Sequence, residues 1–181
     1  MEDHIDHGRA HVGAADPRAG EVWCDLGSGG GVPGLILALL APESEVVLLD
    51  RAVSRCTFLQ SAVSQLDLTN ASVLEGDAAQ LAHDAKWREA FDGIVSRAFG
   101  PPAAVAEVSS GLLRVGGRVI VSEPPSGATG DRWPSVSLAS IGFDTPVPVA
   151  GDYRFVRLVK SGHVGGTTPR SWKRIRKRPL F

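Results

Sequence analysis

The chain has 181 residues, of which 43% are hydrophobic and 22% charged, enough to form one domain with its own core. The longest uninterrupted apolar run, residues 35–41, is far shorter than a membrane span requires. The two cysteines lack metal-ligand spacing and are typical of a reducing compartment. We therefore expect a cytoplasmic globular domain, and the composition excludes secreted disulfide-rich, collagenous and transmembrane classes.

A formal net charge of −1 hides a strong charge asymmetry along the chain. Residues 153–181 hold nine of the 19 Lys and Arg residues and no acid. Clustered cations gain affinity for polyanions by releasing phosphate counterions, and an aromatic ring among them can stack on an unpaired base. We therefore predict an RNA contact, with a solvated basic tail as the alternative. The predicted RNA-binding residues are Arg170, Trp172, Lys173, Arg174, Arg176, Lys177 and Arg178.

Short apolar runs alternate with helical stretches along the sequence. Strands are predicted at 22–26, 46–50, 72–75, 91–96 and 118–122. Helices are predicted from Pro33 to Leu40, at 52–68, at 102–113 and weakly up to 141, with a loop over 124–131 and a final hairpin of 145–149 and 153–160. This alternation predicts an α/β fold: a mostly parallel, twisted sheet with helices on both faces and a C-terminal antiparallel hairpin at its edge.

A glycine-rich turn at residues 27–31 follows the first predicted strand. In open parallel sheets, ligands bind beyond the carboxyl ends of the strands, where this turn lies. The glycines in residues 29–34 formally satisfy GxGxxG, which alone is a weak dinucleotide signal. Asp25 would repel a diphosphate but suits the ammonium and sulfonium groups of S-adenosylmethionine, whereas Asp50 can bind the ribose of either cofactor. We therefore favour S-adenosylmethionine; the other reading is that both acids only cap helices.

Further segments occur in order: DLGSGGGVPG at 25–34, LLD at 48–50, FDGIVSRAF at 91–99, GG at 116–117 and KRPL at 177–180. Together they resemble the bacterial small-subunit (16S) ribosomal RNA guanine-N7 methyltransferases, the family of glucose-inhibited division protein B or methyltransferase G. The resemblance implies a class I methyltransferase (Rossmann-like) fold, S-adenosylmethionine as cofactor and 7-methylguanosine in small-subunit rRNA as product. It implies rRNA or the ribosomal subunit as partner, while the apolar run length and the ligand spacing lead us to expect no membrane and no metal.

From the glycine turn and the strand ends we predict donor contacts for Asp25, Ser28, Gly29 and Asp50. The resemblance implies further donor contacts for Gly27, Val32, Asp77, Ala78, Ala79 and Arg97. The resemblance also makes Arg97 the residue that lines the reaction site, and hence the predicted catalytic residue. We expect an N-terminal helical lead-in over 1–20, a donor-binding domain over 21–162 and a basic tail over 163–181.

Guanine N7 carries a free lone pair at neutral pH, so its methylation needs alignment and no general base or nucleophile. Arg97 can donate to guanine O6 or to a phosphate, or it can pair with Asp50 or Asp77. Phe99 can stack on a base or belong to the core, and Cys24 and Cys56 fall at buried positions of a strand and a helix. Two alternatives remain open: a non-catalytic RNA- or ribosome-binding module with a vestigial donor pocket, and a small-molecule methyltransferase.

Three histidines, at positions 4, 7 and 11, fall on one face of a possible N-terminal helix. A metal site is conceivable there, but no carboxylate or thiol completes a ligand set. We therefore interpret them as surface or partly packed side chains.

Overall fold

A computed structural model describes residues 2–125, 132–149 and 151–181, and in this part of the chain seven strands form one sheet in the order β3-β2-β1-β4-β5-β7-β6. The parallel strands are β1 (Val22–Leu26), β2 (Glu45–Asp50), β3 (Ala71–Glu75), β4 (Phe91–Ser96) and β5 (Leu113–Ser122). The strands β6 (Val147–Val149) and β7 (Phe155–Val159) form an antiparallel pair, and β7 runs antiparallel to β5. The predicted sheet with its C-terminal hairpin is therefore confirmed, while residues 126–131 of the predicted loop lie outside the described residues.

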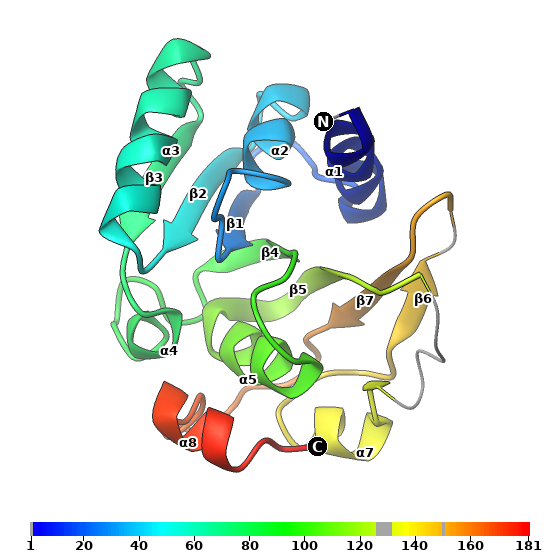
Figure 1. The fold of residues 1–181 in the computed structure, drawn as a ribbon. Coiled ribbons are helices and arrows are strands. Elements are labelled where there is room, and N and C mark those ends of the chain that lie inside the picture. The colour runs from blue at the N-terminus through cyan, green and yellow to red at the C-terminus, as the bar shows by residue number, and fades with distance from the viewer. Residues whose placement is uncertain (1, 126–131, 150) are drawn as a thin grey trace.

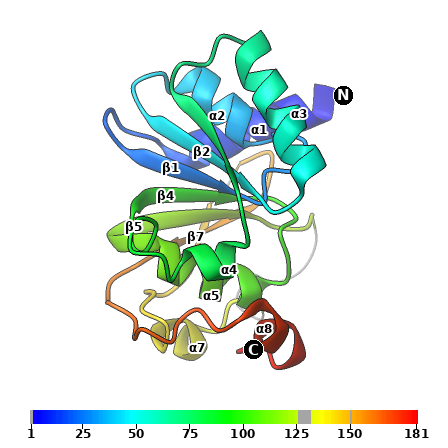
Figure 2. The same ribbon diagram turned by 90° about the vertical axis from the view of Figure 1, so that its left-hand side faces the viewer.

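Helices cover both faces of this sheet (Figures 1 and 2). One face carries α1 (Glu2–Ala15), α2 (Gly34–Leu40) and α3 (Val53–Gln65). The opposite face carries α4 (Ala78–Leu81), α5 (Pro102–Leu112), α7 (Ser135–Ala139) and α8 (Trp172–Lys177). In the described part of the chain, no helix is both long and apolar enough to cross a membrane.

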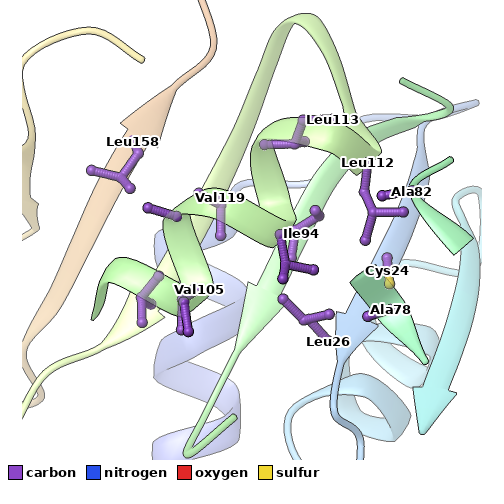
Figure 3. Packing of buried hydrophobic residues seen from close by; sticks show 14 of the residues in the cluster. Cys24, Leu26, Ala78, Ala82, Ile94, Val105, Leu112, Leu113, Val119 and Leu158 are labelled. Carbon is purple, nitrogen blue, oxygen red and sulfur yellow. The ribbon is translucent and has the colours of Figure 1, made fainter. Parts of the chain in front are cut away.

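Each face of the sheet has its own hydrophobic core, which explains the apolar character of the central strands. On the α5 face, Val105 and Leu112 belong to one buried cluster with Leu26 and Ile94 of the sheet (Figure 3). Burying a side chain of this size contributes about 1.5–3 kcal/mol. These contacts hold α5 against β1 and β4, the strands from which loops of the site emerge.

The structure differs from the sequence prediction in α3, which ends at Gln65 rather than at residue 68. Of the apolar residues that define the predicted stripe, Leu59 is buried, but Phe58 and Leu66 are 54% and 46% exposed. The helix lies over β2 and β3 at the margin of the sheet, where a narrow apolar stripe is sufficient.

The predicted lead-in, α1, shares the core of the domain. Val12 and Ala15 are buried, and so is His11, whose Nε2 lies 2.9 Å from the carbonyl oxygen of Ile120 in β5. Burial lowers the pKa of His11 to about 3, so this side chain is a neutral part of the core. The described residues hold no group of three side chains that could bind a metal ion.

Candidate functional site

The turn between β1 and α2 exposes backbone instead of side chains. Gly27 has φ of +76°, a left-handed conformation that favours glycine, and a Cβ there would lie 2.7 Å from Cδ2 of Phe99. The backbone N–H groups of Gly27 and Ser28 both donate to the carbonyl oxygen of Leu49, at 2.9 Å each. The turn is therefore held against the end of β2 and leaves room for a ligand beside it.

Asp25 lies beneath this turn, where it is buried. Its Oδ2 accepts a hydrogen bond of 3.0 Å from the N–H of Gly34, and any side chain at position 34 would collide with it. Burial raises the pKa of Asp25 to about 7, in spite of this hydrogen bond. Asp25 thus holds the start of α2 to β1 and does not line the cavities described below. Asp25 is therefore not placed to attract a cationic cofactor or to repel a diphosphate, the role that we expected for it from the sequence.

Asp50, the last residue of β2, links the glycine turn after β1 to the end of β2. Its Oδ2 accepts from Gly29 N and its Oδ1 from Ala52 N, both at 2.9 Å, while Nη1 of Arg55 lies 3.5 Å from Oδ2. Each carboxylate oxygen has two acceptor sites, so these contacts leave capacity for a further donor.

Asp77 follows β3 and caps α4. Its Oδ1 accepts from Ala79 N at 2.9 Å and from Gln80 N at 3.3 Å. The contacts of the described residues use Oδ1 alone, so Oδ2 can serve a ligand. Ala79 is buried behind this cap and does not line the cavity, whereas Ala78 does.

Two adjoining hollows lie at these strand ends and share Gly27, Arg55 and Ala98. The first has a volume of about 160 Å³ and brings together four of the predicted donor contacts, Gly27, Asp50, Asp77 and Ala78, with Phe99 and Trp172. The second, of about 430 Å³, brings together Gly27, Ser28, Gly29, Val32 and Arg97 with His4.

Arg97 lies at the rim of the second hollow. Its Nη2 donates to Nδ1 of His4 at 2.6 Å, so α1 supplies a partner for Arg97 that no motif or spacing indicated. Asp50, which we considered from the sequence as a partner of Arg97, forms its ion pair with Arg55 instead. Arg51 and Arg55 line the first hollow, so three arginines surround the combined cavity.

Both thiols are buried, as predicted. Burial raises the pKa of Cys24 and also that of Cys56, whose Sγ lies 3.4 Å from the carbonyl oxygen of Asp50. A protonated, buried thiol is a poor nucleophile, so the site does not suit chemistry that needs a thiolate.

The predicted RNA-binding residues divide into two groups. Five side chains are exposed: Lys173, Arg174, Arg176, Lys177 and Arg178. In contrast, Arg170 forms an ion pair of 2.6 Å with Glu107 of α5, and Trp172 lines the first hollow. The guanidinium of Arg170 therefore binds a buried carboxylate of the domain, and Trp172 lines the same cavity as four of the predicted donor contacts.

The strand order, the antiparallel β7 between β5 and β6, and the glycine turn after β1 define a class I methyltransferase fold, the Rossmann-like architecture expected from the sequence. The dinucleotide-binding order 3-2-1-4-5-6 lacks this inserted strand. A SAM-dependent O-methyltransferase from Thermotoga maritima has this fold, with a TM-score of 0.64 and 13% identity over 88% of this chain and 66% of that one. Precorrin-6y C5,15-methyltransferase from Geobacter metallireducens matches with a TM-score of 0.63 and 13% identity, over 86% of this chain and 89% of that one.

A family model named rRNA small subunit methyltransferase G matches residues 11–123, and the chain belongs to this family. A ribosomal RNA small subunit methyltransferase G from Carboxydothermus hydrogenoformans is 38% identical over 101 residues, covering 56% of this chain and 43% of the relative. The relative of that name from Leuconostoc citreum is 30% identical over 141 residues, covering 75% and 59%. This chain thus spans about half the length of the curated relatives that it matches.

Proposed function

We propose that this chain is an S-adenosylmethionine-dependent methyltransferase that acts on small-subunit ribosomal RNA and methylates guanine at N7. The observation that carries the proposal is the cavity at the strand ends, where the glycine turn meets Asp50 and Asp77 in a chain of this family. Such a substrate places the protein in the cytoplasm.

The residues of the first hollow fit the adenosine half of the donor. Asp50 can accept from the ribose hydroxyls, and the free Oδ2 of Asp77 can accept from the amino group of adenine. Ala78 and Phe99 present apolar surface to the base. The second hollow, with its glycine backbone and Arg97, fits the amino-acid arm, whose carboxylate a guanidinium can bind in a bidentate manner.

The chain needs to supply alignment more than acid–base chemistry. When bound, the donor provides an electrophilic methyl group, and guanine N7 already carries the attacking lone pair. A guanidinium has five N–H donors, so Arg97 would use those that the donor's carboxylate leaves free to orient the guanine through O6 or a neighbouring phosphate. Holding two reactants near attack distance can supply about 7–11 kcal/mol of the barrier. The buried thiols agree with a reaction that forms no covalent intermediate with the protein.

The charge distribution supports an RNA substrate. Five exposed cations lie on and just after α8, and Arg51 and Arg55 line the first hollow, which Trp172 of α8 also lines. A phosphate backbone could therefore cross α8 and reach the cavity. This arrangement is more basic than a small-molecule methyltransferase requires.

The test is methyl transfer to a defined acceptor. Small subunits and naked small-subunit rRNA, from cells that lack the gene, are incubated with the full chain and methyl-labelled S-adenosylmethionine, and the modified base is mapped. The proposal predicts label at N7 of a guanine. RNA binding without transfer would identify a non-catalytic module. Label that appears only in the small-molecule fraction of an extract of the same cells, incubated in parallel, would identify the other alternative; either result overturns the proposal.

A further inference from the structure

Trp172, the first residue of α8, forms part of the wall of the first hollow, together with Asp50, Asp77 and Ala78. Its ring lies edge-on to Phe99, with 5.3 Å between ring centroids and 62° between ring planes. Phe99 in turn lies directly over Gly27, where a Cβ would meet its ring. An aromatic pair thus extends from the glycine turn along one side of the cavity.

Trp172 is held in this place by residues far away in the sequence. Just before α8, the guanidinium and the backbone N–H of Arg170 bind the buried carboxylate of Glu107 at 2.6–2.8 Å. Arg88 donates to the carbonyl oxygens of Val164, Gly165 and Thr168 at 2.9–3.1 Å. On α8 itself, Ile175 is buried in the core. The segment 163–181 is therefore docked on the domain, and its aromatic residue faces inward.

The two sides of α8 differ in character. Lys173, Arg174, Arg176 and Lys177 are exposed, whereas Trp172 is half-buried against Phe99 and the cavity. A half-buried indole on the wall of a cavity offers its remaining apolar surface to whatever occupies that cavity. Aromatic side chains bind purines through such surfaces by stacking or edge contacts.

We propose that Trp172 contacts the adenine of the bound donor, so that α8 is a structural part of the donor site as well as a cationic surface. The inference rests on the proposed function and deepens it, because it adds a donor-binding residue from the C-terminal segment. The occupant of this hollow is taken to be the donor because Asp50, Asp77 and Ala78 line it with Trp172, while Arg97 lies at the other hollow.

The experiment measures binding of S-adenosylhomocysteine to the full chain by calorimetry. Trp172→Ala should weaken binding about tenfold, the typical effect of losing an aromatic contact with a base. Trp172→Phe should stay within about threefold of the wild type, because an aromatic ring remains at the contact. Lys173→Ala is the matched control on the same helix: its side chain is exposed and does not line the cavity, so affinity should be unchanged.

Tryptophan fluorescence separates a direct contact from a purely structural role. Of the four tryptophans, all within the described residues, Trp172 is the one that lines the cavity, so S-adenosylhomocysteine should change the emission of the wild type but not of Trp172→Phe. If the wild type binds and Trp172→Ala binds equally well, or if Trp172→Phe retains the fluorescence change, the inference is wrong and the proposed function stands. If the wild type takes up no S-adenosylhomocysteine, the proposed function itself fails.

Discussion

Replacing Arg170 with alanine tests whether the C-terminal segment is docked or free. Glu107 has a side chain that is 2% exposed, and the guanidinium of Arg170 supplies hydrogen bonds of 2.7 Å to its Oε1 and 2.6 Å to its Oε2. Removing one partner of a buried ion pair costs about 3–5 kcal/mol. The side chain of Arg170 is 30% exposed, so water can partly replace it, and we expect a loss at the lower end, about 3 kcal/mol.

Urea unfolding followed by circular dichroism measures this loss. With an m-value of about 3 kcal/mol/M, the midpoint of Arg170→Ala should fall by about 1 M. Arg176→Ala is the matched control, because an exposed arginine of the same segment should change stability by less than about 0.5 kcal/mol. Adding Glu107→Gln to Arg170→Ala should recover part of the loss, since no buried charge is then left unpaired. Equal midpoints for Arg170→Ala and Arg176→Ala would refute the reasoning and leave Arg170 an ordinary surface cation.

Three further outcomes are expected. Gly27→Val forces a branched residue to a φ of +76° and towards Phe99, so it should weaken S-adenosylhomocysteine binding at least about tenfold. Gly13→Ala is the control, because there is open space around its Cβ, and equal affinities of the two variants would contradict the geometry of the turn. Burial holds the pKa of His11 at about 3 against 6.5 when free, so the unfolded chain binds the extra proton below pH 6.5. The stability of the wild type relative to His11→Gln should therefore fall as the pH drops from 6 to 4, by at most about 1.4 kcal/mol per pH unit in urea titrations, and a constant difference would mean that His11 is not buried. Neutralising the five exposed cations of residues 173–178 should flatten the salt dependence of rRNA binding in filter assays and leave S-adenosylhomocysteine affinity unchanged; an unchanged slope would exclude α8 from the RNA contact.

The parts of the fold that depend on local pattern could be predicted from the sequence. The central strands are mostly apolar because both of their faces are covered, and β1 and β4 have the predicted limits. Asp50 and Asp77 line one cavity, because Asp50 ends β2 and Asp77 follows β3, and these neighbouring parallel strands have their carboxyl ends at one edge of the sheet.

The remaining features depend on contacts between residues distant in the sequence. His4 meets Arg97 across 93 positions, and Arg170 meets Glu107 across 63, and neither pairing leaves a periodic signal. A basic run with one tryptophan is typical of a tail, so its docking could not be foreseen. Asp25 shows a related limit: its position before the turn was evident, but its burial, which raises its pKa and removes it from the cavity, was not.

The cavity beside residues 27–29 is expected to bind S-adenosylmethionine and its demethylated product S-adenosylhomocysteine, and not a dinucleotide. Calorimetric titration of the full chain with S-adenosylhomocysteine, and separately with a nicotinamide dinucleotide, tests it most directly. We expect saturable binding of one equivalent of S-adenosylhomocysteine, lost in Gly27→Val, and no heat from the dinucleotide. Saturable uptake of the dinucleotide with none of S-adenosylhomocysteine would contradict it.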